Sequence, residues 1–232
     1  MWIYWVLGIA ATVFALKVYL NGRYNKHKPD MSGKVVVLNG GTAGLGRETG
    51  LELAVLGAKV IITGRDPRGV VEYVNEAAVK AGKPAQAEFH KCDLADLNNV
   101  RQLADQLSKR FTSIDMLINN AALGSNDLNY TKQGFESSVG VNLIGPCYMT
   151  HCLLPLIRQS KEGRVINVGS DAYLYGNQLI TKSEAGLSNW EDFLLQNLKV
   201  EEYNIFKAYF KSKLGNMYFT RKLAEVLQAK KV

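Results

Sequence analysis

The sequence has little cysteine, no dense run of basic residues and no internal repeat. Its three cysteines, Cys92, Cys147 and Cys152, are too few and too scattered for a disulfide framework or a CxxC metal site, which favours a reducing compartment for the folded domain. Cys147 and Cys152 lie near His151 within about one helical turn, but no fourth ligand is close, so no metal site is expected. The formal net charge of +7 comes without a polybasic arm, which argues against nucleic-acid binding.

Residues 2–20 are a long apolar run, WIYWVLGIAATVFALKVYL, with Lys17 as the single charge. As a helix this run would extend roughly 28 Å, enough to cross the hydrocarbon core of a bilayer, and aromatic residues stand at both ends, as interfacial anchors do. Basic residues follow the run and none precedes it. The positive-inside rule therefore places the main domain on the cytosolic face, with the endoplasmic reticulum as first candidate, or on the matrix face of a mitochondrial membrane. Residues 1–29 are expected to be a membrane anchor with a basic flank; a cleaved signal peptide and a buried core helix are the alternatives.

Residues 30–232 have the composition and length of one globular domain with a sizeable core. After Pro29, short apolar runs alternate with helical patterns, which predicts right-handed βαβ units and a doubly wound parallel sheet of the α/β class. The continuous apolar run KVVVLN indicates a strand buried on both faces. The expected strands are 34–39, 58–63, 86–93, 114–120 and 164–169; the expected helices run from the first glycine turn to about Leu56 and over 69–81, 96–111, 132–160 and 204–229.

A glycine-rich turn, NGGTAGLG over residues 39–46, joins the first expected strand to the first helix. Gly40, Gly44 and Gly46 permit a tight turn, close approach of the backbone to a pyrophosphate, and close packing of the helix on the strand. The helix start offers N–H groups and the positive end of its dipole to phosphates. Because this motif occupies the first βα turn of an alternating pattern, it predicts a dinucleotide site; a turn without a ligand is the alternative.

The second expected strand ends in TGRD, which places Arg65 and Asp66 at its tip. A dinucleotide fold that prefers NAD usually has an acidic side chain here for the ribose 2′-hydroxyl, whereas an arginine suits a 2′-phosphate. Asp66 either points away from the ribose 2′ position or competes with Arg65 for it. The alternative for Arg65 is an ordinary charge on the protein surface. The sequence therefore favours NADP(H) over NAD(H) as cofactor.

Further motifs follow the glycine turn in a recognisable order: CDL at 92–94 and NNAA at 119–122. With NGGTAGLG they resemble the TGxxxGxG, adenine-contacting Asp-Leu and NNAG motifs of the short-chain dehydrogenase/reductase family, with Asn39 in place of Thr and Ala122 in place of Gly. The likeness covers about residues 33–228 and is greatest to the membrane-anchored, retinol-dehydrogenase-like branch. It implies the Rossmann form of the doubly wound sheet and a nicotinamide cofactor. The residues that it assigns to cofactor binding are Gly40, Thr42, Gly44, Leu45, Gly46, Arg65, Asp93, Leu94, Asn120, Ala121, Tyr209 and Lys213.

VNLIGP at 141–146, NVGS at 167–170 and YFKSKLGN at 209–216 resemble the family's catalytic motifs. The resemblance assigns catalytic roles to Asn142, Ser170, Tyr209 and Lys213. The tyrosine and the lysine are four residues apart and so share one face of a helix. A neighbouring ammonium and a positive nicotinamide both stabilise phenolate, which brings the tyrosine pKa from about 10 toward the working range. In the family pattern, the serine holds and polarises the substrate oxygen, the lysine also bonds the nicotinamide ribose, and the asparagine holds a water that links the lysine to solvent.

Two features depart from the family pattern. The interval from Ser170 to Tyr209 is long, and its insert at about 172–203 carries several aromatic residues; we expect it to form a lid over an apolar substrate, or a docking surface. The sequence ends at Val232, where family members continue into a sixth strand and a substrate loop, so these C-terminal strands are expected to be missing. The edge of the fifth strand would then need a cover: a continuation of the chain, a protein partner, or the insert.

Two functions follow from these features. The complete set of catalytic residues and the anchor favour a membrane-bound, NADP(H)-dependent oxidoreductase that interconverts an alcohol and a carbonyl on a lipophilic substrate, such as a retinoid, a steroid or a long-chain aldehyde or ketone. The early end of the sequence and the insert favour a non-catalytic, dehydrogenase-like accessory subunit of a membrane assembly.

Overall fold

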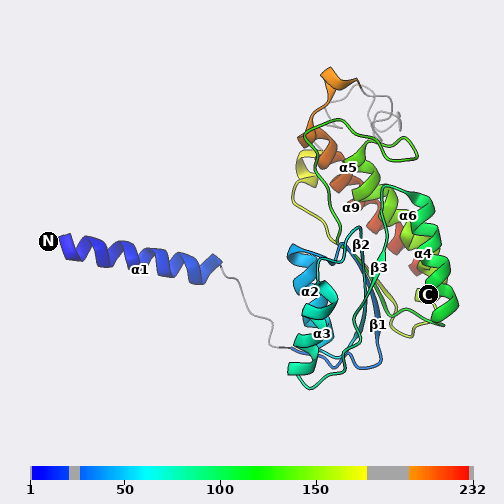
Figure 1. The fold of residues 1–232 in the computed structure, drawn as a ribbon. Helices are drawn as coiled ribbons and strands as arrows, with labels where there is room; N and C mark the ends of the chain where they lie inside the picture. The colour runs from blue at the N-terminus through cyan, green and yellow to red at the C-terminus, as the bar shows by residue number, and fades with distance from the viewer. Residues whose placement is uncertain (1, 21–26, 177–198, 230–232) are drawn as a thin grey trace. The chain divides into compact units, whose positions relative to one another are not determined.

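A computed structural model of the chain describes residues 2–20, 27–176 and 199–229. It divides into two units, Met1–Asp30 and Met31–Val232. The first unit contains helix α1 (Trp2–Leu20; Figure 1). None of its side chains is buried. In length and composition this helix could cross a membrane, as could the half-buried segment Ser137–Ile157, which is a core helix of the second unit.

The second unit is built on five parallel strands in the order β3-β2-β1-β4-β5. The chain moves outward from β1 to β3, returns past β1, and moves outward again through β4 and β5. This reversal between β1 and β4 is the topological switch point of a doubly wound sheet. The predicted doubly wound parallel sheet is therefore confirmed. The strands are β1 (Val35–Asn39), β2 (Lys59–Gly64), β3 (Glu88–Lys91), β4 (Met116–Asn119) and β5 (Arg164–Asn167).

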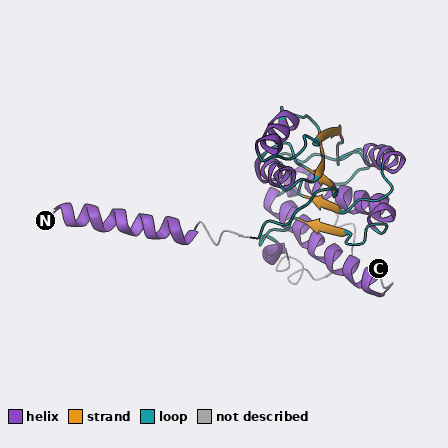
Figure 2. Cartoon of the chain, turned by 90° about the horizontal axis from the view of Figure 1, so that it is seen from below, coloured by secondary structure: helices purple, strands orange, loops and turns teal. Residues whose placement is uncertain are grey.

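Helices cover both faces of the sheet, as Figures 1 and 2 show. Helices α2 and α3 pack on one face, and α4 and α6 pack on the other. Helix α9 packs against the segment Ser137–Ile144 through an apolar cluster that includes Leu143 and Leu214. The helical elements are α2 (Gly44–Val55), α3 (Val70–Lys80), α4 (Leu97–Arg110), α5 (Ser137–Val139), the π-helical turn η1 (Gly140–Ile144), α6 (Gly145–Ile157), the 3₁₀ turn η2 (Val200–Glu202) and α9 (Ile205–Ala229).

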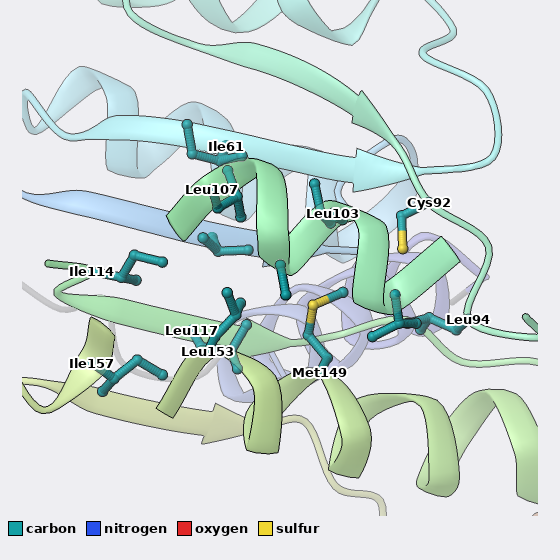
Figure 3. Packing of buried hydrophobic residues seen from close by; sticks show 13 residues of the cluster. Ile61, Cys92, Leu94, Leu103, Leu107, Ile114, Leu117, Met149, Leu153 and Ile157 are labelled. Carbon is teal, nitrogen blue, oxygen red and sulfur yellow. The ribbon is translucent and has the colours of Figure 1, made fainter. Parts of the chain in front are cut away.

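The two-residue period of the strands separates two apolar cores. Along β1, Val37 faces the core beneath α4 and α6, whereas its neighbours Val36 and Leu38 face the core beneath α2 and α3. Figure 3 shows the first of these cores, where Leu107 of α4 and Leu153 of α6 meet the sheet. A strand buried on both faces explains why the sequence of β1 is apolar without alternation.

The expected helix over 132–160 begins later than the pattern suggested. Its first residues form a turn in which the Thr131 N–H donates to the Phe135 carbonyl over 2.8 Å. Glu136 then caps the helix, because its carboxylate accepts from the Ser138 and Val139 N–H groups. A five-residue π-helical turn interrupts the helix at Gly140–Ile144. Most of the expected insert, residues 177–198, lies outside the described residues.

Candidate active site

A cavity of about 510 Å³ lies at the carboxyl ends of β1, β2 and β4. In open parallel sheets this edge, beside the switch point, is where ligands bind. Eight of the predicted cofactor residues line the cavity: Gly40, Thr42, Leu45, Arg65, Asp93, Leu94, Asn120 and Ala121. Gly44 and Gly46 are not among its lining residues, and neither are Ser170, Tyr209 and Lys213.

The glycine turn follows the end of β1 closely. Gly40 has a left-handed φ of 72°, and its backbone lies so near Ala121 that a Cβ could not be accommodated. A Cβ on Gly46 would collide with the Gly40 carbonyl oxygen and with the Asn120 amide. The residue before α2 is Ala43, which offers no side-chain cap. Glycine therefore permits the close approach of turn and helix. The first N–H groups of α2 have no capping side chain, and Ala43 and Leu45 at the start of this helix line the cavity.

The asparagines at the ends of β1 and β4 hold this turn in place. The Asn120 Nδ2 donates to the Gly40 carbonyl over 2.8 Å, and the Asn39 Oδ1 accepts from the Ala121 N–H over 3.1 Å. The Asn39 Nδ2 donates to Asn119, whose own Nδ2 donates to Asn167 at the end of β5 over 2.8 Å. Asn39, which stands where the family pattern has Thr, thus bonds both β4 and the loop that follows it.

Two arginines lie at the tip of β2. Arg65, Asp66 and Arg68 all line the cavity. Asp66 accepts from the Arg68 N–H over 3.3 Å, and its carboxylate lies 3.9 Å from the Arg68 guanidinium. Arg68 itself has a left-handed φ of 49°. Sequence reasoning singled out Arg65 and did not find Arg68; the turn-forming run Asp66-Pro67-Arg68-Gly69 was the signal that a second cation would fold back toward the same edge.

Asn142 lies in the π-helical turn η1 and is buried. Its Oδ1 accepts from the Leu123 N–H over 2.6 Å, and its Nδ2 donates to the Leu123 carbonyl over 2.8 Å and to the Ser212 Oγ over 3.0 Å. Leu123 is a lining residue of the cavity, and Ser212 lies on α9. The side chain of Asn142 therefore joins the loop after β4 to the helix that carries Tyr209 and Lys213.

Lys213 is buried on α9, with 2% of its surface exposed. Its Nζ donates to the Val168 carbonyl over 3.1 Å and lies 5.7 Å from the centre of the Tyr209 ring. Burial lowers the pKa of Lys213, because the charged form loses its hydration. The Tyr209 side chain is half-buried, and within the described ranges its hydroxyl has no hydrogen-bond partner.

Ser170 follows β5 by a short loop. Its Oγ accepts from the Ala172 N–H over 3.2 Å and lies 3.5 Å from the Asp171 carboxylate. Val168, which accepts the hydrogen bond from Lys213, stands two residues before Ser170. Gly176, a little further on, lies against the Phe210 backbone of α9. The segment that carries Ser170 is thus fastened to α9 on both sides of the serine.

These contacts connect Asn142, Lys213 and Tyr209 and place the Ser170 segment beside the same helix. The connection runs through Ser212 and Val168, and the four predicted catalytic side chains do not bond one another directly in the described part of the chain. Sequence reasoning also missed three lining residues that come from distant elements, namely Leu123, Ser137 and Val141.

The sheet order, the glycine turn and the cavity at the switch point define a doubly wound α/β protein of the Rossmann type. The family model for short chain dehydrogenase matches residues 34–182. The chain therefore belongs to the short-chain dehydrogenase family, and the predicted membership is confirmed.

The chain resembles known proteins over most of its length. It is 34% identical over 211 residues to mouse retinol dehydrogenase 14, an alignment that takes in 87% of this chain and 59% of that protein. It is 34% identical to an uncharacterized protein from Mycobacterium paratuberculosis of known crystal structure, with a TM-score of 0.68 over 87% of this chain and 65% of the other. It is 25% identical to a metagenomic short-chain oxidoreductase solved in complex with NADP, with a TM-score of 0.61 over 86% and 78% of the two chains. The chain spans between 57% and 63% of the length of the retinol dehydrogenases that it matches.

Proposed function

We propose that this protein is a nicotinamide-dependent oxidoreductase that interconverts an alcohol and a carbonyl on a lipophilic substrate, with NADP(H) as its preferred cofactor. The observation that carries the proposal is the position of buried Lys213 one helical turn from Tyr209, with its ammonium bonded to the chain between β5 and Ser170. The matching family model and the retinol dehydrogenases among the relatives support it.

The cavity residues fit a dinucleotide. The glycines allow α2 to start close against the turn and Asn120, and the first N–H groups of α2 have no side-chain cap, so they are available to a pyrophosphate. Asp93 and Leu94 line the cavity where an adenine would be held. Arg65 and Arg68 offer two cations to a 2′-phosphate, and the Asp66 carboxylate is engaged by Arg68 and so competes less for the ribose. The NADP complex of a structural relative agrees with this preference.

A bound nicotinamide would supply the hydride in reduction and accept it in oxidation, while the protein provides position and a proton donor or acceptor. Tyr209 donates its phenolic proton to the carbonyl oxygen during reduction and takes it back during oxidation. The Lys213 ammonium stabilises the phenolate that is left, because opposite charges at this separation attract strongly in a partly desolvated site. Ser170 donates a hydrogen bond to the substrate oxygen and so polarises the carbonyl.

Asn142 acts by holding these parts together. Its amide spends both N–H groups on Leu123 and Ser212 and accepts from the Leu123 N–H. This arrangement fixes α9 relative to the cavity loop.

The apolar helix α1 suits a substrate dissolved in a membrane. Its 19 residues carry no acidic side chain and one lysine, and a membrane anchor would keep the domain near lipid-soluble alcohols and aldehydes. Such an anchor, with the domain on the cytosolic face of the endoplasmic reticulum or the matrix face of a mitochondrial membrane, is part of the proposal.

A second candidate is a non-catalytic, dehydrogenase-like accessory subunit. The observation that favours it is the outer strand β5, where Ile166 is 40% exposed and the neighbouring positions are only partly covered. A protein partner that covers this strand would be a permanent neighbour of the Ser170 segment.

The test uses the full chain in detergent micelles. We expect it to bind NADPH at least tenfold more tightly than NADH, and to reduce retinal or another long-chain aldehyde. Tyr209→Phe should lower kcat by about 10²- to 10⁴-fold through loss of the proton donor, with NADPH affinity changed by less than about threefold. Tyr218→Phe, a change of the same kind at an exposed position of α9, is the matched control. A chain that binds NADPH and reduces no member of a broad carbonyl panel would support the accessory subunit instead, and equal rates in the two variants would remove the assigned role of Tyr209.

A further inference from the structure

A fully buried carboxylate lies outside the proposed chemistry. Glu136 is 0% exposed, and a buried charge is costly unless several groups compensate it. Its Oε2 accepts from the Val139 N–H over 2.9 Å, and its Oε1 accepts from the Ser138 N–H over 2.9 Å. The negative charge therefore sits at the positive end of the helix that contains Asn142.

Tyr203 reaches the same carboxylate from a distant part of the sequence. Its hydroxyl donates to the Ser125 carbonyl over 2.7 Å and lies 3.3 Å from the Glu136 Oε1. Burial raises the pKa of Tyr203 and the Glu136 charge raises it further, so this hydroxyl keeps its proton and remains a donor. A helix cap requires only a carboxylate and the N–H groups of the helix. The contact of Tyr203 with Glu136 is therefore additional to the cap.

This connection joins the loop after β4, the start of the helix at Glu136, and the segment just before α9. Ser125 lies in the loop after β4, two residues beyond Leu123, which lines the cavity and bonds Asn142. Tyr203 stands just before α9, and the side chain of Ile205 packs near Gly124 of the same loop. The first turn of α9 is therefore fastened to the cavity loop by one polar and one apolar contact.

Glu136 and Tyr203 are each close in sequence to a residue of the proposed active site. Glu136 stands six residues before Asn142, and Tyr203 stands six residues before Tyr209. Each anchor thus lies less than two helical turns from a residue of the proposed active site. A shift or rotation of the first turn of α9 would move the Tyr209 hydroxyl relative to the cavity while leaving the sheet and its cores in place.

We propose that Glu136 and Tyr203 are positioning residues that hold Tyr209 and Lys213 in register with the cofactor cavity. This inference rests on the proposed function for its effect on rate, but the connection itself does not. It predicts that loss of the Tyr203 hydroxyl loosens the cavity loop and the start of α9 together, and slows the proton-transfer step more than it weakens binding.

The experiment compares the full chain with Tyr203→Phe, which removes one oxygen and keeps the ring in its apolar cluster with Leu143 and Leu214. We expect faster amide hydrogen exchange in residues 121–128 and 205–212, and unchanged exchange in α2 and α4. We expect kcat to fall roughly 10- to 100-fold, as small misplacements of a catalytic group do, with KM and NADPH affinity within about threefold. Tyr218→Phe again serves as the control, with no change expected in either readout.

Glu136 provides a second variant pair. Glu136→Gln retains an acceptor oxygen and should keep part of the rate, whereas Glu136→Ala should lose as much as Tyr203→Phe or more. If both residues act through one connection, the Glu136→Gln Tyr203→Phe double variant should lose less than the product of the single losses. Multiplicative losses would overturn the shared connection.

The exchange readout separates this inference from the proposed function. A wild-type chain that reduces no carbonyl contradicts the function, and the connection is then judged by exchange alone. A joint rise in residues 121–128 and 205–212 in Tyr203→Phe supports it. Unchanged exchange at the start of α9, or an active Tyr203→Phe variant with wild-type kcat, overturns it.

Discussion

The two halves of the sheet are held together in different ways. In the half made of β1, β2, α2 and α3, the strands are buried on both faces, and Val60, Ile61 and Ile62 have no exposed surface. In the half that contains β5 and α9, the outer strand alternates between exposed and half-exposed residues, and Ile166 is 40% exposed. The first half is therefore closed by apolar burial on both faces. The outer strand of the second half has an apolar core on one face only, and side-chain hydrogen bonds also join it to α9.

Those hydrogen bonds connect segments that are far apart in the sequence. Asn142 bonds Ser212, Lys213 bonds the Val168 carbonyl, and Asn167 donates to Thr220 over 2.9 Å. Each bond contributes about 1 kcal/mol to stability, which is small against the apolar cores. Substitutions in the half made of β1, β2, α2 and α3 should thus appear first as loss of stability or of nucleotide affinity. Substitutions in the half that contains β5 and α9 should appear first as loss of catalytic rate.

The largest expected difference between the halves is in stability. Ile62→Ala should lower the free energy of unfolding by about 2–5 kcal/mol, because it leaves a cavity in a closed core. The same substitution on β5, Ile166→Ala, should cost less than about 1 kcal/mol, because much of this side chain is already in contact with solvent. Urea unfolding of the full chain in micelles, followed by far-ultraviolet circular dichroism, measures both.

Equal costs at the two positions would contradict the comparison. They would mean that β5 is covered in solution, and only cover by a separate protein would support the accessory-subunit function.

The next effect is on the nucleotide site and compares two glycines. Gly46→Ala places a methyl group against the Gly40 carbonyl and the Asn120 amide, so the glycine turn must shift. NADPH affinity should fall roughly 10- to 100-fold, equivalent to about 1.4–2.7 kcal/mol. Gly169→Ala, after β5, meets open space and should leave the affinity within about twofold. Isothermal titration of NADPH into each variant distinguishes them, and equal affinities would show that the turn does not contact the cofactor.

The parallel sheet could be predicted from the sequence because β1 and β2 each have a local hydrophobic pattern typical of a buried strand. KVVVLN and AKVIIT are continuous apolar runs bounded by glycine, and such local patterns need no knowledge of their neighbours. The glycine turn was likewise visible, since its position in the first βα unit is part of the motif. The positions of Gly40 and Arg65 at the cavity follow from that local order.

The parts that sequence reasoning missed depend on partners distant in the chain. The late start of the helix before Asn142 follows from the Glu136 cap. Glu136 also lies beside Tyr203, which is 67 residues further along the chain. Arg68 reaches the cavity edge through a left-handed backbone that no propensity predicts for arginine. The bonds of Asn142 to Leu123 and Ser212 can be seen only once the π-helical turn has set its direction.

The smallest effect concerns the opposite edge of the sheet, where one carboxylate joins the two halves. Asp115, just before β4, accepts from the Val35 N–H over 2.8 Å, from the Ser160 hydroxyl over 2.7 Å and from Lys34 over 3.3 Å. Burial by itself would raise the pKa of Asp115, but these hydrogen bonds outweigh it and lower the pKa below the ordinary 3.8. The unfolded chain therefore takes up this proton at a higher pH than the folded chain does.

The stability that Asp115 contributes is accordingly present above pH 3.8 and is lost as the pH falls through its lowered folded-state pKa. Asp115→Asn should reduce the free energy of unfolding by about 1–2 kcal/mol at pH 7, since hydrogen bonds to a charged acceptor become bonds to a neutral one. The gap between wild type and variant should close as the pH drops below 3.8. Asp105→Asn, at an exposed carboxylate paired with Arg101 on α4, is the control and should show a smaller difference. If the difference in the free energy of unfolding between wild type and variant stayed constant down to low pH, the negative charge of Asp115 would play no part in holding β1 against β4 and the end of α6.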